Sequence, residues 1–237
     1  ISSAASDVYK RQVIKNKRLM TQNILKIEDL SLSYANQEVL KNLNLELSKG
    51  ERVSILGESG SGKSSLLRCI AGFESVNNGK IFIKNKLVSS NNLMIPTEKR
   101  NVGMVAQEKA LVPHLTVKKN ISFGIERKKN KDEVVTELTN LFKITNLIDK
   151  LPRQISGGEQ QRVAFARSLA PSPNLLMLDE PFSALDNELK QELYYELDKI
   201  FDKQELSILL VTHDHEEAKI LTSRLFKLAQ GSLISIE

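Results

Sequence analysis

A glycine-rich stretch near residue 60 combines residue types that could bind phosphate groups. Gly57, Gly62, Lys63 and Ser64 match the spacing G-x-x-x-x-G-K-[ST] and follow the apolar run RVSIL at 52–56. Glycine permits backbone angles that other residues avoid, so successive N–H groups can converge on phosphate oxygens at a helix start. Lys63 would reach the β and γ phosphates, and the Ser64 hydroxyl would bind Mg²⁺. The residues expected to form this phosphate cradle are Gly57, Glu58, Ser59, Gly60, Ser61, Gly62, Lys63, Ser64 and Ser65.

Two adjacent acids follow a second apolar run, LLML at 175–178. Asp179 could hold a Mg²⁺ water beside the cradle, and Glu180 could act as the general base for a water molecule that attacks the phosphate. Neighbours on an extended chain point in different directions, so one carboxylate could face the metal and the other the water. A solvated acid pair at a strand end is the alternative.

His213 ends a third apolar run, SILLVT at 207–212. A histidine there could bridge a phosphate oxygen and the general base, orienting the water rather than deprotonating it. A lone histidine is more often structural or exposed, and that interpretation is kept for His114 and His215. No His and Cys spacing indicates a transition-metal site.

The stretch ISGGEQQRVAFAR at 155–167 predicts a helix with an unusual beginning. Ser156 and Glu159 have the spacing of a capping box, which would start the helix without further help. The cap leaves Gly157 and Gly158 unexplained, because glycine costs up to about 1 kcal/mol against alanine in a helix. Bare backbone at a helix start would suit the close approach of an anion, so a second anion site is expected here.

The elements that would position these residues indicate an α/β fold. Residues 24–34, 38–47 and 80–88 alternate or look extended, and they predict a small antiparallel sheet. The runs at 52–56, 175–178 and 207–212 are typical of buried parallel strands. A mostly helical part is expected over about 108–170, with a solvated polar loop at 126–133.

The distribution of charge and the single cysteine limit the partners and the compartment that we expect for the protein. Five of the 34 Lys and Arg residues, against one of the 29 Asp and Glu residues, lie in residues 1–19, so the rest is nearly balanced despite a net charge of +5. Nucleic acid is therefore not expected as a partner. Residues 1–19 are expected to be a non-native or disordered leader before a native start at Met20; a basic targeting arm is the alternative. Single Cys69 suits a reducing cytoplasm, and it is expected to be a buried residue of a helix.

Taken together, the cradle, SGGEQ at 156–160, LLMLDEP at 175–181, SALD at 183–186 and TH at 212–213 resemble the nucleotide-binding subunit of an ATP-binding-cassette (ABC) transporter. The resemblance covers residues 24–237. It implies a P-loop NTPase core, which is a RecA-like mixed sheet with flanking helices, together with an N-terminal antiparallel β subdomain and an inserted α-helical subdomain. Residues 20–237 would form this ATPase domain, which would bind ATP and Mg²⁺.

The resemblance also implies roles for single residues. Tyr34 matches the aromatic residue that stacks on adenine. Gln107 matches the glutamine that senses Mg²⁺ and the attacking water, and Asp186 matches the aspartate that communicates across a dimer. Glu180 and His213 match the catalytic base and the phosphate-sensing histidine. A tyrosine that ends a strand is otherwise more often a packing residue.

Members of this kind work as dimers that sandwich two ATP molecules, so the corner at 156–159 would face the ATP of a second copy or a paralogue. A groove after Gln107 would receive transmembrane permease subunits, placing the chain in the cytoplasm on the inner face of the membrane. The sequence around these motifs is similar to that of importer ATPases served by a solute-binding protein. The similarity is greatest for ferric-iron importers, with thiamine, polyamine and sulfate importers as alternatives. It departs from them at Ala106 and Val112, where phenylalanine is frequent.

Two other classes of protein are the alternatives to a transport ATPase. A cassette protein of translation or DNA repair would use the same motifs, although such proteins usually carry two cassettes or a long coiled-coil insertion. A non-enzymatic nucleotide-binding scaffold would be expected to lack Glu180 or His213, and both are present. Many relatives add a regulatory domain after the cassette, so a chain ending at Glu237 would either lack that domain or be a fragment.

Overall fold

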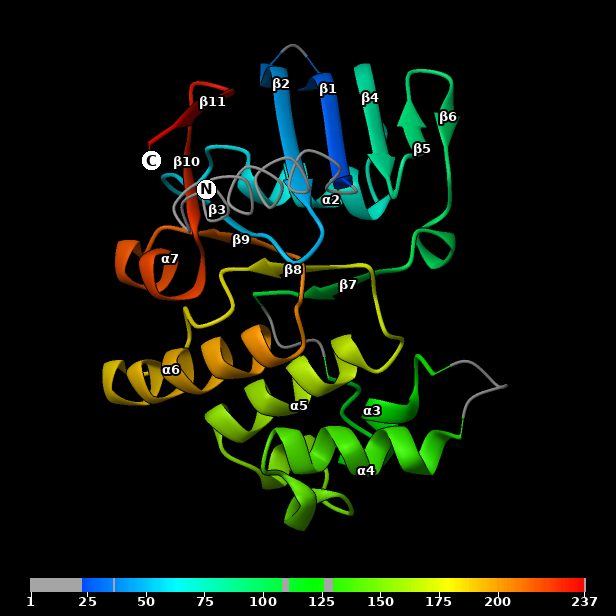
Figure 1. Ribbon diagram of the computed structural model, residues 1–237, viewed down its shortest axis with the longest axis vertical. Coiled ribbons are helices and arrows are strands. Elements are labelled where there is room, and N and C mark those ends of the chain that lie inside the picture. The colour runs from blue at the N-terminus through cyan, green and yellow to red at the C-terminus, as the bar shows by residue number, and fades with distance from the viewer. Residues whose placement is uncertain (1–22, 36, 108–110, 126–129, 237) are drawn as a thin grey trace, which may run out of the picture.

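The computed structural model describes residues 23–35, 37–107, 111–125 and 130–236. The expected leader at 1–19, the expected start at Met20 and residues 126–129 of the expected polar loop at 126–133 lie outside the described residues. The end of that expected loop, from Lys131, is the beginning of a helix. Two β-sheets and a layer of helices are stacked on one another, with the antiparallel sheet at the top of Figure 1 and most of the helices at the bottom. The functional residues expected from the sequence lie on the central sheet and on the elements next to it.

The first sheet is antiparallel, with the strand order β2-β1-β4-β5-β6. Its strands are β1 (Asn23–Tyr34), β2 (Gln37–Ser48), β4 (Asn78–Ile83), β5 (Lys86–Ser90) and β6 (Leu93–Met94). The expectation of one extended piece over 80–88 was wrong, because the chain reverses there. Lys84 and Asn85 both have positive φ, at 48° and 61°, as a tight hairpin turn requires. Lys-Asn is a weaker turn signal than Asn-Gly, so the sequence pattern did not indicate a turn at these residues.

The second sheet is the predicted mixed sheet, with the order β11-β10-β3-β9-β8-β7. Its strands are β3 (Arg52–Leu56), β7 (Val102–Val105), β8 (Leu175–Asp179), β9 (Ile208–Thr212), β10 (Arg224–Ala229) and β11 (Ser232–Ser235). Only the β10–β11 pair is antiparallel among these neighbours. β3, β8 and β9 therefore end at the same edge of the sheet, which is where ligands bind in open α/β sheets.

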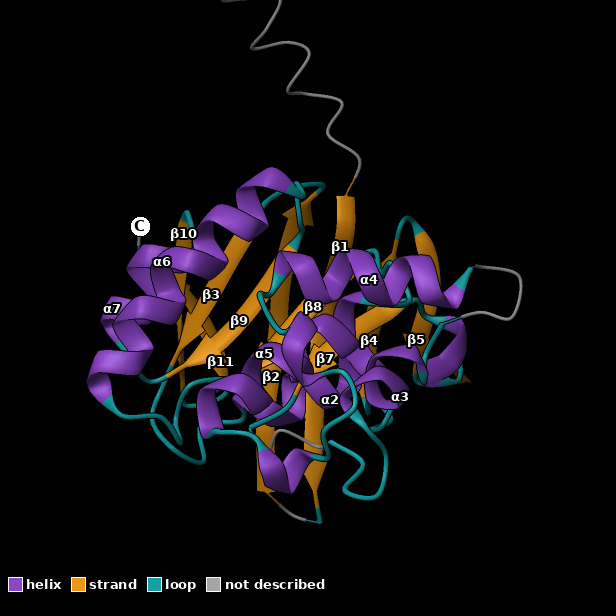
Figure 2. Cartoon of the chain, turned by 90° about the horizontal axis from the view of Figure 1, so that it is seen from below, coloured by secondary structure: helices purple, strands orange, loops and turns teal. Residues whose placement is uncertain are grey.

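Helices cover both faces of this mixed sheet, which explains why its central strands are continuously apolar. The helices are α2 (Lys63–Ala71), α3 (Val117–Ser122), α4 (Lys131–Leu141), α5 (Gly157–Leu169), α6 (Asn187–Lys203) and α7 (His215–Leu221). Figure 2 shows α4, α5 and α6 in front of the sheet. Among the described residues, no helix combines the length and the apolar character needed to cross a bilayer.

The hydrophobic core is divided by the sheet into two clusters. Leu176 and Leu178 of β8 pack with the helices α3–α6, whereas Leu175 and Met177 pack with α2 and the antiparallel sheet. This alternation follows from the two-residue period of a strand. The helical part, expected over about 108–170, shares its core with α6 and the sheet. Buried Cys69 lies on α2, as expected for a small core residue.

Buried Arg100 fixes the end of α2, the helix that follows the cradle. Its guanidinium donates to the carbonyl oxygens of Cys69 and Ile70 at 3.0 Å, and to those of Ile95 at 2.7 Å and Val88 at 3.1 Å. A cation at the C-terminus of a helix interacts favourably with the helix dipole. Arg100 therefore connects the cradle helix to β5 and to the chain that leads into β7.

We expect Arg100→Leu to lower the free energy of unfolding by about 3 kcal/mol. The substitution would leave several buried carbonyl oxygens without a donor, and such losses are among the costly ones. Chemical denaturation would measure the change, with Lys99→Met as the control because Lys99 is an exposed neighbour. A loss no larger than that of the control would show that Arg100 does not anchor the helix.

Candidate active site

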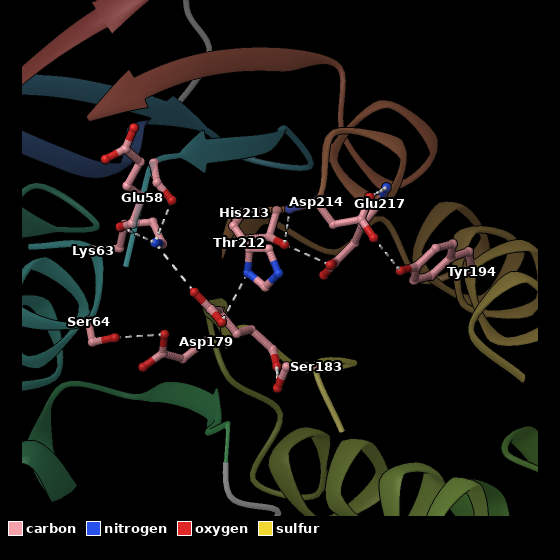
Figure 3. A network of polar contacts seen from close by, with 12 residues as sticks. Glu58, Lys63, Ser64, Asp179, Ser183, Tyr194, Thr212, His213, Asp214 and Glu217 are labelled. Carbon is pink, nitrogen blue, oxygen red and sulfur yellow. Dashed lines mark hydrogen bonds and ion pairs between the residues drawn. The ribbon is translucent and has the colours of Figure 1, made fainter. Parts of the chain in front are cut away.

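The sheet register brings three functional strand ends together. Leu56 of β3 pairs with Thr212 of β9, and Asp179 of β8 pairs with Val211 of β9. The residues that follow these strands therefore emerge at one edge, although they are far apart in the sequence. Figure 3 shows Lys63, Ser64, Asp179 and His213 gathered there.

The cradle depends on glycine for two separate reasons. Gly60 and Gly62 have φ of 79° and 102°, in the left-handed region that other residues rarely adopt. Gly57 lies where a Cβ would come within 2.6 Å of the Ser61 Oγ and 2.9 Å of the Leu228 carbonyl oxygen. The loop can thus turn sharply into α2, whose first N–H groups lack partners within the helix and can bind an anion.

Lys63 is folded back over the cradle. Its side chain is only 4% exposed, and its Nζ donates to the carbonyl oxygens of Gly57 at 2.7 Å and Glu58 at 3.0 Å. The same Nζ lies 3.3 Å from Oε1 of Glu180. A single buried ammonium group therefore joins the loop after β3 to the acid after β8.

Ser64 and Asp179 place two oxygen ligands side by side. The Ser64 Oγ donates to Asp179 Oδ1 at 3.0 Å. Burial raises the pKa of Asp179, while the hydrogen bond from Ser64 opposes that increase. Among the described residues, no group of three or more His, Cys, Asp and Glu side chains could hold a metal ion by itself. A hydroxyl and one carboxylate fit Mg²⁺, which usually completes its shell with water and substrate phosphates.

Glu180 has an unusual backbone. Its φ of 43° lies in the left-handed region, and its N–H donates to the Val211 carbonyl oxygen at 2.9 Å. The Ser183 hydroxyl donates to the Glu180 carbonyl oxygen at 3.0 Å, which helps to hold the turn. Asp179 and Glu180 have different partners, as the sequence predicted. The backbone reverses direction at Glu180, however, so simple alternation along an extended chain does not explain this separation.

The Glu180 carboxylate lies between two basic groups. Its Oε2 is 3.2 Å from Nδ1 of His213, and its Oε1 faces Lys63. The His213 side chain is 61% exposed, whereas the carboxylate is 16% exposed. The carboxylate is therefore held at the edge of the site, beside an exposed imidazole that does not itself line the cavity next to the cradle.

Tyr34 and Gln107 complete a cavity of about 360 Å³ beside the cradle, and Lys63, Ser64 and Glu180 also line it. Tyr34 is 41% exposed, and its hydroxyl donates to Glu74 Oε2 at 3.1 Å. Its ring is thus held at the wall of the cavity with a free surface. Sequence reasoning missed Gln37 and Val39, two further lining residues on β2, because nothing in the pattern of β2 marks them.

The corner before α5 has the predicted capping box. The Ser156 Oγ accepts from the Glu159 N–H at 3.3 Å, and Glu159 Oε2 accepts from the Ser156 N–H at 2.7 Å. The latter hydrogen bond lowers the pKa of Glu159. A Cβ on Gly158 would lie 2.8 Å from Cδ2 of Leu189, so packing against α6 explains this glycine within one chain. Gly157 is exposed and remains open to an approaching group.

Asp186 lies beside this corner at the start of α6. Its side chain caps the helix by accepting from the Leu189 N–H at 3.0 Å, and Leu189 in turn covers Gly158. Neither Asp186 nor any residue of 156–159 lines the cavity beside the cradle. The structure therefore brings the expected site residues together as two separate groups on one chain.

Sequence reasoning also missed a polar network behind His213. Thr212, Asp214, Glu217 and Tyr194 are joined by hydrogen bonds between β9, α7 and α6 (Figure 3). Asp214 and Glu217 have the spacing of a capping box, which could have pointed to them. The Glu217 carboxyl nevertheless accepts from the Thr212 hydroxyl and not from the Asp214 N–H. Sequence spacing does not indicate which of these two hydrogen bonds forms.

Comparisons with known proteins agree with this geometry. The family model described as ABC transporter matches residues 40–183, more than half of the chain. The Fe(3+) ions import ATP-binding protein FbpC 2 of Haemophilus influenzae is 39% identical over 227 residues, covering 93% of this chain and 63% of that protein. The spermidine/putrescine import ATP-binding protein PotA of Thermotoga maritima is 43% identical over 214 residues, covering 89% and 57%. The chain therefore spans about three fifths of the length of these relatives.

Solved structures show the same fold. The dimeric structure of a post-hydrolysis state of the ATP-binding cassette MJ0796, bound to ADP and Pi, matches with a TM-score of 0.76 at 28% identity. The match covers 90% of this chain and 99% of that chain. The α/β fold class predicted from the sequence is thereby confirmed.

Proposed function

This chain belongs to the ABC transporter family, and from that premise we propose that it hydrolyses ATP to power solute uptake through a membrane permease. The observation that carries the proposal is the placement of the Glu180 carboxylate between Lys63 and His213, beside the Ser64–Asp179 pair. This set contains a phosphate-binding cation, a pair of metal ligands and a candidate base. Those are the parts that phosphoryl transfer to water requires.

Each residue has a task in this proposal. The cradle N–H groups and Lys63 bind the phosphates. Ser64 and Asp179 would hold Mg²⁺, which would supply positive charge beside the phosphate oxygens. Glu180 accepts a proton from the attacking water, while His213 holds the carboxylate and reaches the phosphate. Gln107 lines the cavity near the metal ligands, and the exposed ring of Tyr34 offers a surface on which adenine can stack.

A second copy of the chain, or a paralogue, completes the site in this proposal. The corner at Ser156 has a helix start and the exposed Gly157, but it does not line the cavity of its own chain. The related cassette MJ0796 forms a dimer with ADP and Pi bound. We therefore assign the corner and neighbouring Asp186 to the ATP held in the partner's cradle. Ser156, Gly157 and Glu159 would then contact that ATP, and the packing of Gly158 against Leu189 would hold the corner in place.

An apolar hollow offers a docking place for permease subunits. It has a volume of about 350 Å³, and its lining includes Phe73, Ala106, Phe123 and Arg167. Phe73 and Phe123 are 56% and 66% exposed, and exposed aromatic residues of this size are typical of interaction sites. Part of its lining, from β7 and Ala106, precedes Gln107, whereas the groove is expected after Gln107. Phe123 and Gly124 are the lining residues that belong to that later segment. Docking there would hold the chain at the inner face of the cell membrane.

The cargo is proposed from relatives, because substrate contacts belong to other subunits. The relatives import Fe(3+) ions or spermidine and putrescine. We propose ferric iron, delivered by a solute-binding protein, with polyamine, thiamine and sulfate as alternatives. Uptake assays of the assembled transporter with each solute would decide among them.

The test of the enzymatic proposal uses two nearby histidines. Native chain should hydrolyse ATP only with Mg²⁺, and His213→Ala should lower turnover at least about tenfold because the carboxylate and phosphate lose their orienting group. Phosphate release would be measured alongside binding of a fluorescent ATP analogue. His215→Ala is the matched control, since His215 is an exposed residue two positions further along. Absence of turnover in the native chain, or equal effects of both substitutions, would refute the proposal.

A further inference from the structure

We propose that Glu217 is a positioning residue that holds His213 in place through the hydroxyl of Thr212. The inference rests on the proposed ATPase function, because it concerns the orientation of a residue of that site. Glu217 is on α7, behind the strand end that carries His213, and it does not line the cavity beside the cradle. It would therefore act without touching the substrate.

The geometry links the residues on both sides of His213. The Thr212 Oγ1 donates to Glu217 Oε2 at 2.8 Å, and the same Oγ1 accepts from the Asp214 N–H at 3.0 Å. One hydroxyl thus joins the residue before His213 to the residue after it, with Glu217 as its anchor (Figure 3). Thr212 and Glu217 are 1% and 3% exposed, so the link is shielded from water.

A second set of contacts fixes the same turn from the other side. Asp214 Oδ1 accepts from the backbone N–H groups of Glu216 and Glu217, at 2.9 and 3.2 Å. The buried Tyr194 hydroxyl of α6 lies 3.5 Å from Asp214 Oδ2. The exposed His213 ring consequently stands on a turn whose backbone is held by buried groups. Its 3.2 Å contact with Glu180 depends on where that turn lies.

The surroundings of Glu217 favour a neutral carboxyl. Burial raises its pKa to about 8, Asp214 and Glu180 add to the increase, and the Thr212 hydrogen bond and Lys190 oppose it. Tyr194 also faces this carboxyl from α6. Oε1 of Glu217 is buried and has no hydrogen-bond partner within the described part of the chain. A neutral group tolerates that position at a much lower cost than a carboxylate does.

Alkaline pH should therefore disturb the site through Glu217. Ionisation would place a negative charge close to Asp214 and Glu180 in a buried position, and it would draw water or displace the strand end. The pKa in the folded chain lies above the ordinary value of 4.5. The unfolded chain thus loses this proton first, and the free energy of unfolding should fall as pH rises from about 4.5 to about 8.

The experiment measures kcat and KM for Mg-ATP from about pH 6.5 to 9.5 in four chains. In the native chain, kcat should fall around the pKa of about 8, and this fall should be absent in Glu217→Gln, which mimics the neutral acid. At pH values below about 8, Glu217→Gln should keep at least about a third of the native kcat. Glu217→Leu should lower kcat by about ten- to a hundredfold with KM within about threefold, because misplacement affects the reacting geometry. Glu216→Gln, an exposed neighbour, should match the native profile.

A second measurement does not depend on turnover. The NMR signal of the His213 ring should shift in Glu217→Leu and in Thr212→Val, which removes the hydroxyl while keeping the shape, but not in Glu216→Gln. Thr212→Val also replaces Glu217→Leu if the latter fails to fold. The positioning role would be overturned if the His213 signals did not change in these variants. It would also be overturned if the kcat of Glu217→Gln fell at alkaline pH as the kcat of the native chain does. A native chain without ATP turnover would instead refute the proposed function, and the His213 signals would still decide whether Glu217 positions the ring.

Discussion

Glu180→Gln should bind Mg-ATP, lose hydrolysis by at least about a hundredfold and accumulate as a dimer. Glutamine keeps the shape of the side chain and can still bind near Lys63 and His213, but it cannot accept a proton from water. The closed dimer would then persist, because the step that opens it no longer occurs. Light scattering would give the mass with and without Mg-ATP, and phosphate release would give the turnover.

The control for this variant removes a carboxylate away from the site. Glu98→Gln changes an exposed residue of a short turn before β7 and should hydrolyse ATP as the native chain does. If Glu180→Gln retained turnover within about threefold of native, Glu180 would not be the general base. If turnover were lost without an increase in mass, Glu180 would be needed for hydrolysis, but the prediction of a trapped dimer would be refuted.

Ser156→Arg should leave ATP binding nearly intact while abolishing ATP-induced dimerisation and hydrolysis. Ser156 is exposed and does not line the cavity of its own chain, so nucleotide binding to one chain should not need it. A long cationic side chain at the corner would block the close approach that the exposed Gly157 permits. Titration with a fluorescent nucleotide would measure ATP binding, light scattering would measure dimerisation, and phosphate release would measure hydrolysis.

Arginine also removes the helix cap, which is worth about 1 kcal/mol, so a second variant separates the two effects. Ser156→Asp keeps a good cap but places a negative charge where a phosphate of the partner's ATP would lie. It should lose dimerisation and hydrolysis with little loss of stability. Normal turnover in either variant would contradict a shared site.

The residues of the cradle and of the three strand ends could be predicted from the sequence because their signals are local. Each of the strands β3, β8 and β9 is a short apolar run followed at once by a functional residue, and parallel strands bring such ends to one edge. The capping box at Ser156 and Glu159 is local in the same sense. Spacing within a few residues was sufficient in these cases.

Other features depend on contacts between distant segments. The turn at Lys84 and Asn85 lacks a strong turn dipeptide, and β7 is only four residues long, so neither gave a clear pattern. The packing of Gly158 against Leu189 joins residues 31 positions apart and cannot be recognised from the glycines alone. Its consequence is that the case for an approaching ligand now rests on Gly157 and the helix start, not on both glycines.

Chemical detail at the site was the hardest part to foresee. The left-handed backbone of Glu180 occurs together with a hydrogen bond to β9 and a turn closed by Ser183, and no local preference of glutamate indicates it. Glu217 likewise chooses Thr212 as its partner because α7 packs against the end of β9. Sequence patterns name candidate residues, but tertiary packing decides which groups face one another.

Mixing two inactive variants tests the shared site most directly. Lys63→Ala damages the cradle and Ser156→Arg damages the corner, so neither variant alone can form a site in which cradle and corner are both intact. In a mixed dimer, the intact cradle of one chain would meet the intact corner of the other and restore one complete site. Phosphate release from an equal mixture should recover to as much as roughly a quarter of the native rate, since half the dimers would carry one intact site of two. No recovery at any mixing ratio would contradict an ATP site built from two chains.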